Sequence, residues 1–201
     1  MLRLYDTRLS GNAWKVRILL RQLKIPFERV TMDLATGDHT KPEFRKKAKF
    51  ARIPVLEFDD GRTLVESPAI LTYLAEGTPF LPDDKFLRAE VAAWLFFEQS
   101  DLLKAIAYPR VWTLRGLTRE KAQQIADFRE FAYPALQKVE DWLAMHEWLV
   151  ADRYTIADIN MFAYVAMAHE GGYAMDRFPA IAAWIARVKE QPGWVPLVEE
   201  A

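Results

Sequence analysis

Over the first 78 residues, short apolar runs typical of β-strands alternate with segments whose apolar residues recur at helical spacing. The predicted strands are Leu2–Tyr5, Phe27–Met32, Pro54–Phe58 and Thr63–Val65, and the predicted helices are Asn12–Leu23, Lys41–Lys47 and Ser67–Ala75. Asp60 and Gly61 supply a turn that would join the last two strands as a hairpin. The resulting order, βαβ followed by a short helix and ββα, predicts an α/β domain.

After a connection rich in glycine and proline at residues 77–82, the pattern becomes entirely helical. Helices are predicted at about residues 86–108, 118–146, 155–169 and 179–190. Pro109 and Pro134 fall inside two of these patterns and are expected to end or kink the helices. Thr155 and Asp158 have the spacing of a helix-capping box.

These patterns divide the chain into two domains. We predict an α/β domain over residues 1–77, a linker over residues 78–86 and an all-helical domain over residues 87–201. The chain lacks an apolar run near the ~20 residues of a membrane span. Its first residues also lack the basic and then apolar order of a secretory signal, so we expect a cytoplasmic protein with no membrane partner.

The composition limits the chemistry that the protein can perform. The 201 residues include no cysteine, which excludes a disulfide, a protein thiolate nucleophile and a cysteine-ligated zinc site. His39, His146 and His169 are widely spaced, so no metal is expected, and the alternative left open is an all-carboxylate site. The formal net charge of −1 argues against a nucleic-acid partner. Residues 1–78 nevertheless carry a net charge of +4, which favours a small anionic ligand.

Glu66 and Ser67 form the strongest local signal, because they stand where the last helix of the first domain begins. Ser67 is predicted as the N-cap, with Pro68 at the first helical position. The Ser67 hydroxyl and the free N–H groups of the helix suit a ligand carboxylate, and Glu66 suits an ammonium group beside it. Together they match the two charges of an α-amino acid. The alternative is that Ser67 only caps the helix and Glu66 is solvated.

Two further positions have the same double interpretation. A cis Ile53–Pro54 bond would leave the Ile53 backbone free to pair with the backbone of a ligand, whereas the alternative is an ordinary trans bond. Ser10 precedes the first helix, where its hydroxyl can donate to an anion. The alternative is that Ser10 or Asn12 only caps this helix. Ser10 has no His–Asp partner in the sequence, so it is not interpreted as a nucleophile.

Taken in order and spacing, these motifs resemble the glutathione S-transferase family, and the resemblance covers essentially the whole chain. It rests on Ser10-Gly11-Asn12-x-x-Lys15-Val16-Arg17, Ile53-Pro54-Val55-Leu56, Glu66-Ser67-Pro68-Ala69-Ile70-x-x-Tyr73-Leu74 and Tyr154-Thr155-Ile156-Ala157-Asp158-Ile159. The resemblance implies a thioredoxin-like first domain with a mixed four-stranded sheet. It also implies glutathione as co-substrate and a helical domain that supplies the second-substrate pocket.

The resemblance further implies a role for individual residues. Ser10 would donate to the glutathione thiolate, with Asn12 as a second donor and Thr7 as a rival hydroxyl; Tyr5 is expected in the core instead. The groups implied to hold glutathione are Glu66 and Ser67 at the γ-glutamyl end, Ile53 before a cis Pro54 at the cysteinyl backbone, and His39 and Lys41 at the glycine carboxylate.

In the helical domain, Asp101 resembles the acid that reaches the glutathione amino group across a dimer interface in many relatives. Tyr108 and Trp112 would then line the pocket of the electrophile. The alternative is that Asp101 is solvated and the tryptophan belongs to the core. One segment departs from the family pattern, because residues 48–52 have Lys49 and Ala51 where the family has proline and glycine. This departure leaves the contacts to the glycine end open.

We therefore expect a homodimeric glutathione transferase that activates the glutathione thiol for attack on small hydrophobic electrophiles. The absence of cysteine disfavours the branches that use a protein cysteine, and the Ser-Ser-Cys signature of the maleylacetoacetate-isomerase branch is missing. Two alternatives remain open. One is a catalytically weak, transferase-like binding or interaction protein, which the altered loop at residues 48–52 favours. The other is a glutathione-dependent dehalogenase or peroxidase.

Overall fold

The computed structural model describes residues 1–199, and the chain separates into two compact units. The first unit comprises Met1–Thr78 together with the C-terminal tail, which we define as residues 191–199. The second unit is Pro79–Glu190. The sequence had placed the tail with the helical domain. Its contacts lie with the first unit instead, because Trp14 and Arg17 donate hydrogen bonds to its backbone carbonyls.

A mixed four-stranded sheet forms the middle of the first unit, with strand order β2-β1-β3-β4. The strands are β1 (Leu2–Asp6), β2 (Phe27–Thr31), β3 (Val55–Glu57) and β4 (Thr63–Val65). β1 pairs in parallel with β2, and β3 is antiparallel to both β1 and β4. The predicted fold class, a mixed four-stranded α/β domain followed by an all-helical domain, is confirmed.

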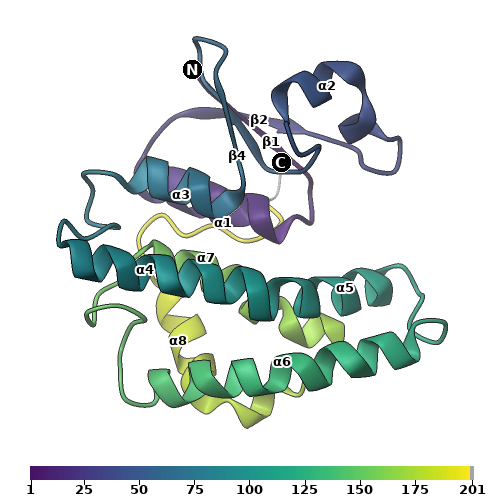
Figure 1. Cartoon of the computed structure of the whole chain (residues 1–201), viewed down its shortest axis with the longest axis vertical. Helices are drawn as coiled ribbons and strands as arrows, with labels where there is room; N and C mark the ends of the chain where they lie inside the picture. Colours follow the sequence, from purple (N-terminus) through teal and green to yellow (C-terminus); the bar gives the residue numbers. More distant parts are fainter. Residues whose placement is uncertain (200–201) are drawn as a thin grey trace. The chain divides into compact units, whose positions relative to one another are not determined.

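Helices cover both faces of this sheet, as Figure 1 shows: α1 (Gly11–Gln22) and α3 (Ser67–Ala75) lie together on one face, and α2 (Pro42–Lys47) lies on the other. Alternation along the strands assigns the side chains to the faces. Leu4 and Leu56 are paired in register and fully buried on one face. On the other face, Tyr5 and Val55 pack against Phe44 of α2.

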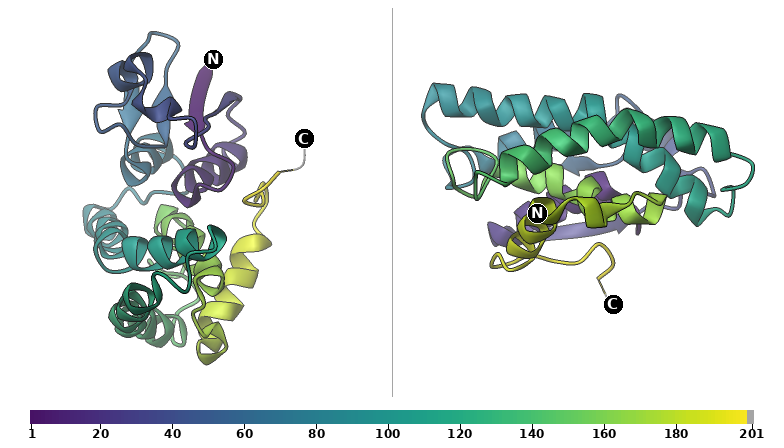
Figure 2. Two further views of the ribbon diagram at one scale, coloured as in Figure 1. Left: turned by 90° about the vertical axis from the view of Figure 1, so that its right-hand side faces the viewer. Right: turned by 90° about the horizontal axis from the view of Figure 1, so that it is seen from below.

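The second unit is a bundle of helices, seen from two sides in Figure 2. Its members are α4 (Lys85–Phe97), α5 (Leu103–Leu114), α6 (Ala122–Leu143), α7 (Ile156–Met167) and α8 (Pro179–Lys189), with two short 3₁₀ turns at Ala168–Gly171 and Met175–Arg177. α7 contacts α4, α5 and α8 and is buried almost throughout its length, so it forms the centre of the bundle. Within residues 1–199, no helix has the length and apolar character needed to cross a membrane.

The helix expected over residues 86–108 differs from the prediction in two ways. It is interrupted by a π-helical segment, Glu98–Leu102, and after this segment the chain continues as α5 through Pro109 to Leu114. Pro134 likewise lies inside α6, so neither proline ends its helix. At Pro109 the backbone of Gly171 packs directly on α5, since a Cβ at Gly171 would lie 3.2 Å from the Pro109 Cβ. Tertiary packing therefore holds α5 together where local propensity disfavours it.

The predicted capping box at the start of α7 is confirmed and has a wider role. Thr155 Oγ1 accepts from the Ala157 amide at 3.2 Å, and Asp158 Oδ2 accepts from the Thr155 amide at 2.9 Å. Asp158 Oδ1 also accepts from the Leu149 amide at 3.1 Å and from the Trp184 indole at 3.0 Å. Burial raises the pKa of Asp158 to about 6, while these donors act in the opposite direction. One carboxylate thus joins the start of α7 to α8.

We expect Asp158→Ala to destabilise the protein by at least about 3 kcal/mol, because it leaves the buried amides of Thr155 and Leu149 and the Trp184 indole without their acceptor. The shift of the urea unfolding midpoint measures this loss. The control is Asp176→Ala, which removes an exposed carboxylate from a 3₁₀ turn of the same unit and should change stability by less than about 0.5 kcal/mol. Equal effects of the two substitutions would contradict the role assigned to Asp158.

Candidate functional site

Ser10 lies between β1 and α1 and is the N-cap of α1. Its Oγ accepts from the Ala13 amide at 3.1 Å, and its own amide donates to the Thr7 carbonyl at 3.1 Å. Of Ser10 and Asn12, Ser10 is therefore the residue that caps α1. Capping uses the oxygen as an acceptor and leaves the hydroxyl proton available for donation. The first turn of α1 holds no acidic residue, so the positive end of the helix dipole is not neutralised there.

Asn12 and Ser67 connect the N-terminal ends of α1 and α3. The buried Ser67 hydroxyl donates to Asn12 Oδ1 at 3.1 Å. The prediction that Ser67 is the N-cap was wrong, because Glu66 holds that position and Ser67 is the first residue of α3. Ser67 uses its hydroxyl for the contact between the helices instead. Since both helices begin here, their free N–H groups and positive dipole ends converge on one region.

Glu66 has an unusual backbone conformation, with φ 69° and ψ 115°. A positive φ is costly for a residue with a Cβ, and such strain is concentrated at binding sites. The carboxylate of Glu66 has no hydrogen bond or ion pair to another residue in the range 1–199. It is therefore a free anionic group beside the N-terminal end of α3.

Ile53 and Pro54 immediately precede β3, with Pro54 between Ile53 and the first strand residue. Of the two alternatives for the Ile53–Pro54 bond, the structure has the cis form. Regular pairing starts at Val55, which lies opposite both Tyr5 and Val65. Within the described part of the chain, the backbone N–H of Ile53 makes no hydrogen bond. It can therefore pair with an extended ligand.

His39 and Lys41 lie in and just after the short 3₁₀ turn η1 (Asp38–Thr40), which precedes α2. The Nδ1 atom of His39 is shielded from solvent and has no partner among residues 1–199. The Lys41 ammonium, by contrast, binds Asp38 Oδ1 at 2.6 Å, and this hydrogen bond raises the pKa of Lys41. Of the two, His39 has the uncommitted group. Neither residue has a hydrogen bond or ion pair to Ser10, Glu66 or Ser67.

Glu57 anchors α2 to the sheet, a role that the sequence analysis missed. It accepts a hydrogen bond from the Tyr5 hydroxyl at 2.6 Å and pairs with the Lys47 ammonium. These two donors hold the pKa of Glu57 below its usual range, whereas burial and Glu57 raise the pKa of Tyr5. Tyr5 is thus committed to this network, as its expected place in the core implied. A carboxylate within a strand was the signal that could have identified Glu57.

The segment at residues 48–52, which departs from the family pattern, contains a second strained position. Ala51, which stands where the family pattern has glycine, has φ 49°, in the region that favours glycine. Within residues 1–199, Arg52 has no ion pair, and Lys49 lies only over the Phe50 ring, at 5.1 Å. Arg45 and Lys46 of the preceding helix α2 have no ion pair either. This segment is therefore strongly cationic.

In the helical unit, Tyr108 and Trp112 of α5 stack with their ring centroids 5.6 Å apart. Phe128 of α6 completes the group at 5.6 Å from Tyr108 and 5.9 Å from Trp112. Packing of α5 on α6 brings Phe128 into this cluster. Tyr108 remains 46% exposed, so the cluster presents aromatic surface. Asp101 lies in the π-helical segment and accepts from the Ser100 hydroxyl.

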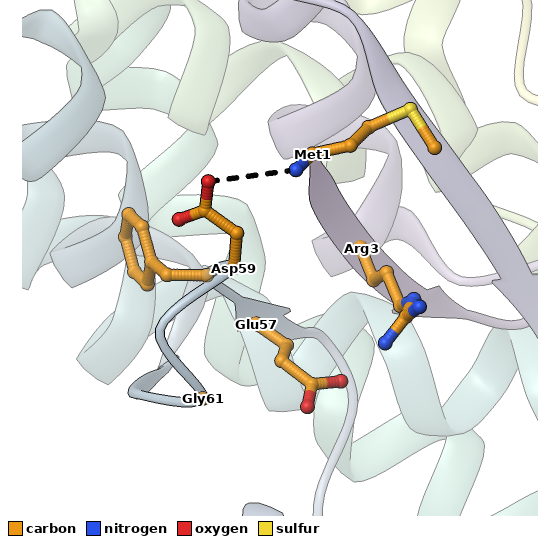
Figure 3. A pocket seen from close by; sticks show the side chains of 6 residues that line it. Met1, Arg3, Glu57, Asp59 and Gly61 are labelled. Atoms are coloured by element: carbon orange, nitrogen blue, oxygen red, sulfur yellow. Dashed lines mark ion pairs between the residues drawn. The ribbon is translucent and has the colours of Figure 1, made fainter.

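A separate hollow of about 200 Å³, drawn in Figure 3, lies at the other end of the sheet. It is lined by Met1, Arg3, Glu57, Phe58, Asp59 and Gly61. The lining residues come from the start of β1 and from the β3–β4 hairpin, whereas Ser10 follows the end of β1. The five residues of β1 therefore separate the hollow from the candidate site, which the starts of α1 and α3 form.

No group of three or more histidine, aspartate or glutamate side chains within residues 1–199 is placed to hold a metal ion. The polar groups described above are hydroxyls, backbone and side-chain amides, and single carboxylates. They suit a zwitterionic organic ligand better than a cation.

Comparison with known proteins gives matches over most of the chain. The family model described as "Glutathione S-transferase, N-terminal domain" matches residues 1–76, and the model of the corresponding C-terminal domain matches residues 89–192. A crystal structure of a glutathione S-transferase from Pseudomonas fluorescens is similar over 98% of this chain and 99% of that one, with a TM-score of 0.96 and 38% identity.

Curated relatives extend the comparison. Glutathione S-transferase 3 of Zea mays is 33% identical over 79% of this chain and 74% of its own length. Maleylacetoacetate isomerase of Pseudomonas aeruginosa is 28% identical over 90% of this chain and 87% of its own. The relatives thus include more than one activity.

The strained Ala51 generates a prediction about stability. We expect Ala51→Gly to raise the free energy of unfolding by about 0.5–1 kcal/mol, because glycine adopts a positive φ without steric cost. The same substitution at Ala69, an exposed position in α3, should lower it by about the same amount. Thermal or urea unfolding of the two variants measures both changes. Destabilisation by Ala51→Gly would show that the loop is not strained.

Proposed function

Because this chain belongs to the glutathione S-transferase family, we propose that it activates the thiol of glutathione for attack on small hydrophobic electrophiles. The observation that carries this proposal is that α1 and α3 meet at their N-terminal ends. The hydrogen bond from Ser67 Oγ to Asn12 Oδ1, 3.1 Å long, joins them there. Two helix N-termini, a free carboxylate on Glu66 and an uncommitted hydroxyl proton on Ser10 make this region complementary to an anionic tripeptide.

The γ-glutamyl end of glutathione has one carboxylate and one ammonium group. In our proposal, the N–H groups at the start of α3, together with Ser67, bind the carboxylate, and the Glu66 carboxylate binds the ammonium. The Ile53 backbone pairs with the cysteinyl residue. His39 and Lys41 are assigned to the glycine carboxylate, and Lys41 would have to share its ammonium with Asp38. Asp101 is assigned to the ammonium group from the second subunit of a homodimer.

Ser10 is the group assigned to the thiol. A free thiol has a pKa of about 8.5, and hydrogen bonding together with a helix N-terminus lowers it. The Ser10 hydroxyl would donate to the sulfur, with Asn12 as a second donor, so that the thiol proton is released to solvent near neutral pH. The thiolate then forms a bond to the electrophilic carbon, and the leaving group departs with its electron pair. This sulfur is the ligand's own, which fits a chain without cysteine.

The aromatic group of Tyr108, Trp112 and Phe128 is the surface that we assign to the electrophile. Stacked rings that remain partly exposed bind flat apolar molecules without fixed hydrogen-bond geometry. A cytoplasmic location belongs to the same proposal, because the reduced tripeptide requires a reducing compartment.

A second candidate function is a binding or interaction protein with weak catalysis. The altered segment at residues 48–52 favours it, because this segment carries free cations and a strained Ala51 where the family has glycine. Fold alone does not decide between these functions.

Titration calorimetry with reduced glutathione tests the proposal. We expect saturable binding in the micromolar to millimolar range, with S-methylglutathione binding through the same contacts. A matched variant, Glu66→Gln, should weaken binding by roughly 10-fold, since it removes the charge that faces the ammonium group. Binding without turnover of an aryl halide would favour the interaction protein, and the absence of any binding would overturn the proposal.

Ser10 also caps α1, so its variants must separate catalysis from stability. Ser10→Gly retains most of the capping ability, whereas Ser10→Ala loses it at a cost of about 1 kcal/mol. We expect both to lower kcat/KM by ~10- to 1000-fold, because both remove the donor to the thiolate. Asp84→Ala removes the cap of α4 and should reduce stability without this loss of turnover. Unchanged turnover in Ser10→Gly would move the role to Thr7 or Asn12.

A further inference from the structure

Asp6 and Arg17 form an ion pair that encloses the loop between β1 and α1. Asp6 ends β1, and Arg17 lies in α1 two turns after Ser10. Both side chains are fully buried, with Arg17 Nε 3.0 Å from Asp6 Oδ2. Arg29 of β2 contacts the same oxygen at 2.8 Å. One buried carboxylate therefore joins the strand before the loop of Thr7 and Ser10 to the helix that follows this loop.

The C-terminal tail supplies the second carboxylate of this cluster. Two arginines around Asp6 leave an excess positive charge, which is costly in a buried environment. Glu199 Oε2 lies 2.9 Å from Arg17 Nη1 and 3.6 Å from Arg29 Nη1. Glu199 lies 182 residues after Arg17 in the sequence, so tertiary structure alone brings this charge to the loop.

The guanidinium of Arg17 divides its donors between the sheet and the tail. Nε faces Asp6, while Nη2 donates to the Leu197 carbonyl at 2.6 Å and Nη1 to the Pro196 carbonyl at 3.3 Å. The planar group has a fixed geometry. A change in the position of the tail therefore alters the direction in which Nε meets Asp6.

The rest of the tail fits α1 closely. The Trp14 indole donates to the Val195 carbonyl at 2.8 Å, and the Trp14 and Trp194 rings meet edge to face at 6.4 Å. Gly193 has φ 81°, and a Cβ there would lie 3.0 Å from the Cα of Gln22. In Figure 2 the yellow tail passes beside the purple helix α1.

We propose that Glu199 and Arg17 are positioning residues for the Ser10 hydroxyl, and that the C-terminal tail is therefore a functional part of the thiol site. This inference rests on the function proposed above. Neutralising Glu199 removes the charge that balances the arginines and admits water to Arg17. The Asp6–Arg17 pair then weakens, and the loop between β1 and α1 becomes less ordered.

The test compares Glu199→Gln with Glu190→Gln, a matched change at the exposed end of α8. In Glu199→Gln we expect faster amide hydrogen exchange over residues 7–13 in the ligand-free protein. We also expect kcat/KM for glutathione to fall by roughly 10-fold, as for a small displacement of a catalytic group, and its pH midpoint to move to higher pH. Glu190→Gln should match the wild type in all three measurements.

Three results would overturn the inference. One is a Glu199→Gln variant with wild-type exchange over residues 7–13. Another is an unchanged pH midpoint, since a purely structural tail would not alter the thiol. The third is exchange that is faster throughout the protein, which would assign the tail to general stability. If the wild type shows no glutathione turnover at all, the proposed function fails, and the exchange comparison still decides whether Glu199 orders the loop.

Discussion

The buried ion pair between Asp6 and Arg17 is the constraint on which the first unit depends. Asp6 ends the central strand, Arg17 lies in the helix that packs on it, and neither side chain is exposed to solvent. Two buried charges are tolerated only when opposite charges and hydrogen bonds surround them. Here Arg29 and Glu199 supply the further charges, and the carbonyls of the C-terminal tail accept hydrogen bonds from Arg17. Strand, helix and tail are thus required together, and removing any of them leaves a buried charge without its partner.

This constraint fixes the end of β1, and with it the region where the site residues meet. α1 and α3 begin side by side because Ser67 bonds to Asn12. The groups around them are left with free capacity: a hydroxyl proton on Ser10, a carboxylate on Glu66 and a backbone N–H on Ile53. Backbone strain at Glu66 lies in the same region. Ser10, Ile53 and Glu66 are only partly buried, and their uncommitted groups are the ones that a ligand would satisfy in the function proposed above.

The helical unit follows a different principle, in which one carboxylate organises apolar packing. Asp158 receives donors from Thr155, Leu149 and Trp184, and thereby ties the start of the central helix α7 to its neighbours. Around this point the core is apolar and closely packed, as the contact of Gly171 with Pro109 shows. The partly exposed aromatic group at Tyr108, Trp112 and Phe128 is the exception, because three large rings remain together at the surface.

The sequence by itself determined the elements, their order and the motifs, because these depend on local periodicity, turn residues and capping chemistry. It therefore predicted the sheet, a cap of α1 at Ser10 or Asn12 and the box at Thr155 and Asp158, but it placed the cap of α3 at Ser67 and the tail with the helices. Only the tertiary structure decided that Ser67 bonds to Asn12, that Glu57 anchors α2 and that Glu199 completes the charge around Arg17. These pairs join residues that lie apart in the chain. A buried donor or charge pairs with whichever group the fold brings within reach, and no local sequence pattern encodes that group.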